Sequence, residues 1–73
     1  MNPRISIDPK VCHGQPVVAG TRVPVAIVIG SLAGGMTFDD VAKEYSISAE
    51  DIRACLAWAA QLADREKLYP MAG

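Results

Sequence analysis

The segment Gly14–Val25 restricts the backbone of this chain more than any other stretch. Its sequence is GQPVVAGTRVPV, with two glycines, two prolines and one arginine around short runs of β-branched residues. Proline fixes φ and lacks an N–H group, whereas glycine allows backbone conformations that other residues avoid. This density of restricting residues predicts a tightly specified turn-and-strand element that presents one defined shape.

A small β element is expected around this segment. Ile5–Ile7 alternates in polarity and then meets an Asp-Pro turn, which predicts a first strand. Residues 15–18 predict a second strand, and residues 21–23 are able to pair back on it after a short turn. Strands this short cannot fold alone, so residues 1–23 are expected to form a β-rich cap on a larger body.

Three helices are expected over residues 24–67, which form the helical core. Pro24 suits the first position of a helix, where its missing N–H group has no consequence, and Gly34-Gly35 supplies the stop. Thr37 begins a second helix and Ser48 begins a third. Each of these two residues is followed three positions later by an aspartate, which is an acidic variant of the capping box.

The order of the last two helices is typical of a helix-turn-helix motif. A short helix, a three-residue turn that contains the apolar Ile47, and a longer helix follow one another. The predicted fold class is therefore mainly α: a three-helix helix-turn-helix core, homeodomain-like or winged-helix-like, with a small N-terminal β element. One domain spans residues 1–73. The open alternative is a plain three-helix core that shares this geometry and does not contact DNA.

A helix-turn-helix function predicts which residues would contact DNA. In such motifs the N-terminal residues of the last helix meet base edges. Arginine recognises phosphate or carboxylate oxygens with two hydrogen bonds, so Arg22 could contact either DNA or a partner protein. The alternative for Arg22 is a structural role through bonds to local carbonyl groups. The expected DNA-binding residues are Arg22, Lys43, Ser48, Ala49, Glu50 and Arg53.

The charge distribution argues against strong DNA binding by this chain alone. Residues 37–73 carry seven acidic and four basic residues, a balance of −3, whereas residues 1–36 have a balance of +2. Phosphate contacts dominate affinity for DNA, so an acidic helix pair binds DNA weakly by itself. A homodimer, or a basic partner bound to the chain, would resolve this conflict.

Apolar residues exceed what a chain of this size can bury. They make up 51% of 73 residues, and a chain this short buries only about 60% of its unfolded surface. We therefore expect a partner that covers the surplus. The residues expected to face a second copy or a toxin are Ile27, Ala54, Trp58 and Leu62. The alternative for Trp58 is that the N-terminal strands of the same chain cover it.

The remaining faces of the helices are expected to form the core. Helical spacing assigns the core side of the third helix to Ile52, Cys55, Leu56, Ala59 and Ala63. Tryptophan is enriched in the most important contacts of protein interfaces, which favours an outward role for Trp58. The third helix is therefore expected to have one core face and one partner face.

No catalytic, cofactor or metal site is expected, and the chain is predicted not to be an enzyme. Cys12 and His13 are adjacent, a spacing that suits neither a zinc site nor a thiolate–imidazole pair. Cys55 is expected to be a small core residue. Two cysteines, no signal peptide and no apolar run long enough to span a bilayer indicate a cytoplasmic protein without a membrane partner.

The segment that restricts the backbone also carries a family resemblance. Residues 14–25 resemble the pattern G-x-P-x-I-x-G-T-R-I-P-V of the DUF433 family, which has VapB-like members. Ile7-Asp8-Pro9 resembles the family's opening I-x-x-D-P element, and Gly35-Met36-Thr37 resembles its link before the helix pair. Residues 45–52, YSISAEDI, resemble its Y-P-x-L-S-x-E-D-I segment. The resemblance covers about residues 5–62.

This resemblance implies both a fold and a function. It implies a helix-turn-helix fold with an N-terminal strand element, and the antitoxin half of a toxin–antitoxin pair, usually beside a PIN-like nuclease toxin. Such an antitoxin would bind its toxin through apolar surface and repress its own operon as a complex. The alternative is a stand-alone dimeric DNA-binding regulator without a toxin. At Ser46 the family often has proline, a difference expected to change only the stiffness of the turn.

Overall fold

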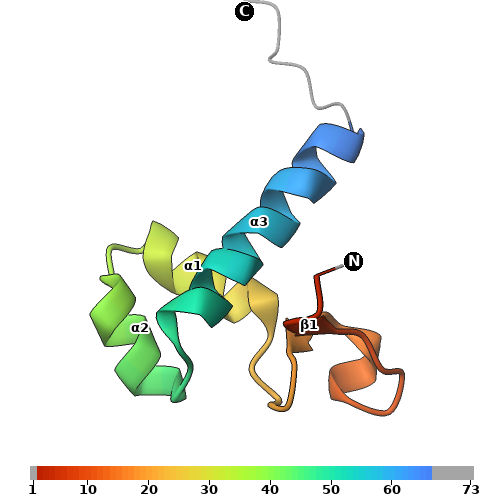
Figure 1. Cartoon of the computed structure of the whole chain (residues 1–73), viewed down its shortest axis with the longest axis horizontal. Coiled ribbons are helices and arrows are strands. Elements are labelled where there is room, and N and C mark those ends of the chain that lie inside the picture. Colours follow the sequence, from red (N-terminus) through yellow and green to blue (C-terminus); the bar gives the residue numbers. More distant parts are fainter. Residues whose placement is uncertain (1, 67–73) are drawn as a thin grey trace, which may run out of the picture.

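The computed structural model describes residues 2–66 and contains three α-helices, one short 3₁₀ helix (η1) and a two-stranded sheet (Figure 1). The elements in chain order are β1 (Ile5–Ser6), η1 (Cys12–Gly14), β2 (Val17–Val18), α1 (Val25–Ala33), α2 (Phe38–Tyr45) and α3 (Ala49–Glu66). This arrangement confirms the predicted mainly α class with a small N-terminal β element. The helix end expected near Lys67 lies outside the described residues. Within residues 2–66, each helix is too short or too polar to cross a membrane.

The predicted N-terminal sheet is present and has two strands. β1 and β2 pair in an antiparallel manner, with Ile5 opposite Val18. The expected third strand at residues 21–23 is reduced to flanking contacts: the Val18 N–H donates to the Val23 carbonyl over 2.9 Å, and Pro24 forms an isolated bridge with β2. Proline cannot donate a hydrogen bond to a neighbouring strand, so the pairing does not extend into a third strand.

The turn between β2 and α1 is built by Gly20 and Thr21. Gly20 has a φ of +80°, a left-handed conformation that glycine adopts without steric cost. The Thr21 hydroxyl donates to the Val18 carbonyl over 2.7 Å and accepts the Val23 N–H over 3.0 Å. These bonds close the turn and give the segment the defined shape that its restricted residues predict.

Helix α1 begins where this segment ends. Pro24 is the N-cap, one residue before the helical position predicted for it. The Val25 N–H, which has no acceptor within the helix, donates to the Pro16 carbonyl over 2.9 Å. At the other end, the C-cap Gly34 is followed by Gly35 at a φ of +105°. The glycine stop is therefore confirmed.

Both predicted capping boxes are present at the starts of α2 and α3. Thr37 Oγ1 accepts the Asp40 N–H over 3.0 Å, and the Asp40 carboxylate accepts the Thr37 N–H over 3.2 Å. Ser48 Oγ accepts the Asp51 N–H over 3.1 Å, and the Asp51 carboxylate accepts the Ser48 N–H over 3.0 Å. Each box satisfies N–H groups that have no acceptor in the first turn of a helix.

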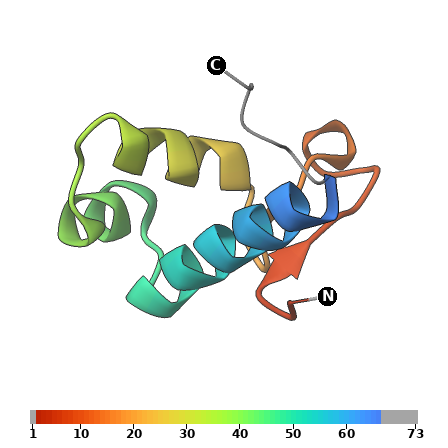
Figure 2. The ribbon, with the colours of Figure 1, turned by 90° about the horizontal axis from the view of Figure 1, so that it is seen from above.

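The core lies where the three helices meet the sheet. Figure 2 shows α1 and α3 side by side, with α2 at one end of the body. Ser31 on α1 and Tyr45 on α2 share a hydrogen bond of 3.1 Å between their hydroxyl groups, which joins these two helices. The buried core residues are Ile5, Val18, Val25, Val28, Val41, Ile47, Ile52, Ala54 and Cys55.

The buried face of α3 differs from the predicted one. Ile52 and Cys55 are fully buried as expected, but Ala54, which was expected to face outward, is only 5% exposed. Leu56, expected in the core, is 38% exposed, and Ala63 is exposed as well. Helix α3 packs against β1 as well as against α1 and α2. The prediction was wrong because spacing along one helix does not reveal which side a distant strand covers.

Helix α2 ends at Ser46 in a left-handed conformation. Ser46 has a φ of +55°, and its N–H donates to the Ala42 carbonyl. Proline cannot take this conformation, because its ring fixes φ near −65°. A proline at position 46 would therefore not fit the backbone of this turn. A residue with a side chain carries a steric cost here.

Glycine at position 46 is expected to stabilise the protein. Ser46→Gly should raise the free energy of unfolding by about 1 kcal/mol, because it removes the left-handed strain. Ser46→Pro should lower it by about 3 kcal/mol, because it forces a different φ and removes the N–H donor. Urea unfolding followed by Trp58 fluorescence measures both changes. Ser46→Ala keeps the strain and is the control; a gain from alanine equal to that from glycine would contradict this explanation.

One ion pair joins the start of the sheet to the start of α3. Arg4 Nη1 lies 2.9 Å from Asp51 Oδ1, and the other oxygen of this carboxylate accepts the Ser48 N–H. The Ser48 N–H and the Arg4 guanidinium lower the pKa of Asp51 below its usual value. The two side chains belong to residues 47 positions apart, and no local sequence pattern indicates their pairing.

The Asp51 carboxylate is expected to stabilise the fold above about pH 4. Its pKa is lowered by folding, so its contribution is present above the usual pKa of about 3.9 and is lost as the pH falls through the lower folded value. Asp51→Asn should lower the free energy of unfolding by about 1 kcal/mol at neutral pH, with a difference that shrinks in acid. Thermal unfolding across pH, followed by circular dichroism, measures this.

Arg4→Gln separates the two causes of this stabilisation. It removes the ion pair and leaves the capping bond from Ser48, so its effect at neutral pH should be smaller than that of Asp51→Asn. A difference between the wild type and Asp51→Asn that stays constant from neutral to acidic pH would show that the carboxylate charge has no such role.

Candidate functional site

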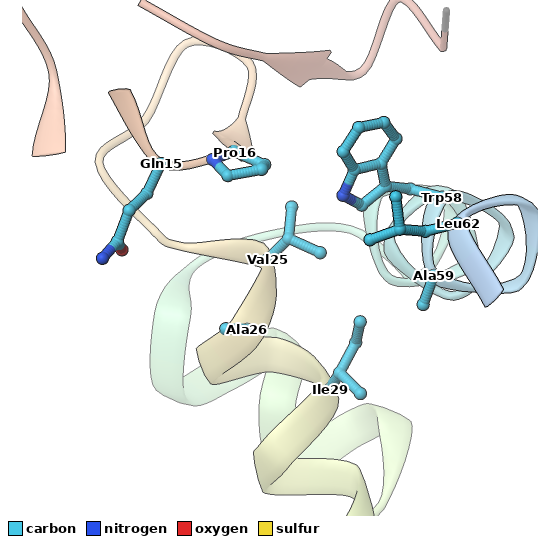
Figure 3. Close-up of a pocket in the computed structure, with 8 residues that line it drawn as sticks. All are labelled: Gln15, Pro16, Val25, Ala26, Ile29, Trp58, Ala59 and Leu62. Carbon is cyan, nitrogen blue, oxygen red and sulfur yellow. The ribbon is translucent and has the colours of Figure 1, made fainter. Parts of the chain in front are cut away.

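An apolar groove opens where the segment 14–25, α1 and α3 meet (Figure 3). Its volume is about 300 Å³. The residues that line it are Gln15, Pro16, Val25, Ala26, Ile29, Trp58, Ala59 and Leu62. Figure 3 shows Trp58 and Leu62 on the α3 side of the groove, opposite Val25 and Ile29 of α1. Three separate parts of the chain thus build one concave surface.

The restricted segment forms one end of the groove. The hydrogen bond between the Val25 N–H and the Pro16 carbonyl holds these two lining residues together. The strand between them is anchored in the protein, since Val17 and Val18 are 2% and 1% exposed. Pro16 is therefore presented at the groove on a backbone that is fixed at both sides.

Helix α3 supplies the opposite wall. Trp58 and Leu62 are four residues apart and therefore lie on the same side of the helix, one turn apart. Trp58 is half-buried and Leu62 is 38% exposed. The C-terminal turns of α3 extend beyond α1 and α2 (Figure 1). Pro16 shares the groove with Trp58, so the N-terminal segment covers the indole in part and leaves the rest accessible.

The lining determines what the groove is able to hold. Apart from Gln15, the lining residues are apolar, and no lining residue is charged. A phosphate or carboxylate group would find no ion pair there, whereas the Gln15 amide offers one donor group and one acceptor. The volume lies at the low end of the range for small-molecule sites. The groove therefore suits one or two apolar side chains of another molecule.

The residues predicted to face a partner lie in three different places. Trp58 and Leu62 line the groove, as described above. Ile27 is 46% exposed on α1 but lies outside the groove lining. Ala54 is buried, which contradicts its predicted outward position, and it borders a separate hollow. The structure thus brings Trp58 and Leu62 together and separates the other two residues from them.

The predicted DNA-binding residues of α3 lie near a second, shallower hollow. Its volume is about 350 Å³, and it is lined by Asn2, Pro3, Arg4, Glu50, Arg53, Ala54 and Ala57. Ser48 and Ala49 are exposed at the start of the helix, with the Ser48 hydroxyl engaged in the capping bond. Glu50 and the ion-paired Asp51 balance the charges of the two arginines. This hollow therefore lacks the excess positive charge that phosphate contacts need.

Arg22 and Lys43 lie on other elements. Lys43 is exposed on α2, and Arg22 is exposed in the turn before α1. The Arg22 backbone carbonyl accepts a hydrogen bond from the Cys12 thiol over 3.5 Å. Its guanidinium group makes no hydrogen bond to the described part of the chain. The alternative that this side chain bonds to local carbonyl groups therefore finds no support among residues 2–66.

The two cysteines occupy different environments. Cys55 is fully buried, as predicted, and burial raises the pKa of its thiol to about 11, which makes it unreactive. Cys12 is partly exposed in η1, where Cys12 and His13 have positive φ values of 49° and 58°. In the part of the chain that the structure describes, no group of three His, Cys, Asp or Glu side chains could hold a metal ion.

Sequence reasoning found one wall of the groove and missed the other. It singled out Trp58 and Leu62, but it assigned no binding role to Pro16 or Ile29. The groove exists because residues 14–18 fold back beside both helices. A pattern within one helix does not contain this information, although Pro16 and Val25 belong to the segment with the strongest family resemblance.

The chain is similar to known proteins over most of its length. It matches the family described as "Protein of unknown function (DUF433)" over residues 5–59. It is 40% identical over 52 residues to a Mycobacterium tuberculosis protein named "Putative antitoxin VapB45"; the match covers 71% of this chain and 22% of that protein.

Two crystal structures of other proteins have a fold similar to that of this chain. Rv2018 from Mycobacterium tuberculosis has a TM-score of 0.66 and 40% identity, with 71% of this chain and 24% of that chain covered. A DUF433 member protein from Anabaena variabilis has a TM-score of 0.75 and 31% identity, with 86% of this chain and 66% of that chain covered. This chain thus spans less than a quarter of each of these two mycobacterial matches. The family match includes the whole restricted segment and most of the groove lining, so this chain belongs to the DUF433 family.

Proposed function

We propose that this chain is a non-enzymatic binding module of the antitoxin type, which holds a toxin protein at the apolar groove. The observation that carries this proposal is the partly exposed pair Trp58 and Leu62, which faces Val25 across an uncharged groove. Such a lining binds apolar side chains and offers no catalytic group. The toxin would insert one or two large apolar side chains between α1 and α3.

Similarity supports the antitoxin role. A relative with 40% identity carries the name of an antitoxin, and the family resemblance implies a PIN-like nuclease toxin as the partner. Only 22% of that relative is matched, so the similarity concerns a module and not the whole relative. The antitoxin and its toxin would act in the cytoplasm, and their complex would repress the operon that encodes them.

The groove has the properties of an energetically important contact. Tryptophan is enriched among residues that carry most of the binding energy of an interface. Trp58 is half-buried, so a partner has only part of the indole left to cover. The uncharged lining also avoids the large penalty of removing ionised groups from water.

Leu62→Glu is expected to weaken toxin binding at least tenfold, which is about 1.4 kcal/mol. The new carboxylate would be buried against an apolar partner without a counter-charge. The measurement is isothermal titration calorimetry with the product of the neighbouring gene, after a co-expression experiment has shown that the two proteins purify together.

Ala60→Glu is the matched control for this experiment. It adds the same charge at an exposed position two residues away, which lies on the opposite side of α3. Binding should remain as in the wild type. Equal loss in both variants would show a general charge effect and would argue against the groove as the site. If the two proteins neither purify together nor restore growth to cells that express the toxin, the antitoxin proposal is wrong.

A stand-alone dimeric DNA-binding regulator is the second candidate function. Helix α2, a turn with the buried Ile47 and helix α3 follow one another in the order of a helix-turn-helix motif. Bases would meet Ser48, Ala49, Glu50 and Arg53, while Lys43 and Arg22 would contact phosphates. The net charge of −3 over residues 37–73 argues against this second function, because negative charge repels the phosphates of DNA.

The two candidate functions differ in their behaviour in a gel-shift assay with the promoter of the gene. We expect no shift by the purified chain at physiological salt, and a shift in the presence of the toxin. A shift by the chain alone would favour the second candidate if Arg53→Gln abolishes it. Lys10→Gln is the control, since it removes one exposed positive charge far from α3 in the sequence.

A further inference from the structure

An apolar segment follows α3 directly in the sequence. Residues 68–71 have the sequence LYPM, here called the LYPM segment, and residues 68–73 carry no charged side chain. The segment comes after the end of α3 at Glu66 and lies outside the described part of the chain. Segments that stay exposed to water are typically polar and poor in aromatic residues. The composition of this segment therefore favours a position against another apolar surface.

The groove lies within reach of this segment. Leu62 is the lining residue nearest the end of α3, and at 1.5 Å per residue it lies about 6 Å before Glu66, whereas Trp58 lies about 12 Å before it. An extended chain advances about 3.3 Å per residue, so Tyr69 can lie about 10 Å from Glu66 and Met71 about 17 Å from it. A segment that turns back along α3 thus brings Tyr69 to the level of Leu62 and Met71 to that of Trp58.

Pro70 favours such a change of direction. Proline inside a helix removes a hydrogen bond and clashes with the preceding turn, so it does not continue α3. The residue before a proline is restricted to extended conformations, which here applies to Tyr69. The chain is therefore expected to leave the helical path before Pro70 and to be extended where it could lie over the groove.

We propose that the LYPM segment occupies the apolar groove of its own chain. Tyr69 packs against Leu62 and keeps its hydroxyl group in water, as tyrosine at the edge of an apolar surface does. Met71 packs against Trp58, a favourable contact between a thioether and an aromatic ring. A toxin then has to displace the segment before it binds, a consequence that rests on the proposed function because it requires the toxin to use the same groove.

The connection to α3 selects this occupant over a separate molecule. The groove of about 300 Å³ suits one or two apolar side chains, and Tyr69 and Met71 provide two. Neither the groove lining nor the segment carries a charged side chain, so no ionised side chain has to leave water. A segment on a short link has an effective concentration on the order of millimolar at its site. A weak contact therefore forms within one chain at concentrations where a separate peptide of equal affinity stays unbound.

Fluorescence and nuclear magnetic resonance of the full chain, without a toxin, test this proposal. Trp58 is the only tryptophan of the chain, so its emission reports on the groove. The wild type should show nuclear Overhauser contacts between the Tyr69 ring and Leu62, and between the Met71 methyl group and the Trp58 indole. The double variant Tyr69→Ser, Met71→Ser should shift the emission of Trp58 to longer wavelength and increase its quenching by acrylamide. Ala72→Ser is the matched control, since it adds a hydroxyl group beside the segment and keeps both large side chains.

Three results would overturn the proposal. The first is a wild type without these Overhauser contacts, and the second is a double variant whose Trp58 is quenched as in the wild type. The third is an emission of Trp58 that changes on dilution from about 1 mM to about 1 μM, because a contact within one chain does not depend on concentration.

The toxin distinguishes a failure of this proposal from a failure of the proposed function. If the segment covers the groove for more than half of the time, the double variant should bind the toxin more than about twofold more tightly than the wild type. A changed Trp58 emission together with an unchanged toxin affinity would support the segment in the groove and would place the toxin on another surface.

Discussion

The hydrogen bond from the Val25 N–H to the Pro16 carbonyl sets the geometry on which the rest of the structure depends. Pro24 has no N–H group, and the Val23 N–H is bound to the Thr21 hydroxyl, so Val25 carries the first donor after the turn. This donor is also one of the N–H groups that a helix start leaves without an acceptor. One bond therefore ends the strand region, begins α1 and places Pro16 beside the helix as part of the groove.

The other two helices are positioned by polar groups at their first turns. A chain of 73 residues has a small core, and here that core consists mainly of valine and isoleucine. The capping residues Thr37 and Ser48 define where α2 and α3 begin. Arg4 then joins the second of these caps to the sheet through Asp51. Trp58, in one wall of the groove, lies two turns farther along the same helix.

Local features of the fold could be predicted from the sequence, whereas features that depend on distant contacts could not. The caps at Thr37 and Ser48 involve residues three positions apart, so their pattern is visible in a short window. The buried side of α3 depends on where β1 packs, and Ala54 was consequently placed on the wrong face. The groove has the same origin: Trp58 was found from its residue type, but Pro16 reaches it only through the folded chain.

Residues 23–38 carry no charged side chain, so neither side of α1 contains an ionised group. The side that bears Ile29 forms a wall of the groove, and the side that bears Gly30 is exposed. Binding at the groove therefore removes no ionised group of α1 from water, so the free energy of association does not have to offset that penalty. The same lack of charge leaves α1 without an ion pair, so its position in the described part of the chain depends on packing and on the hydrogen bonds of Val25 and Ser31.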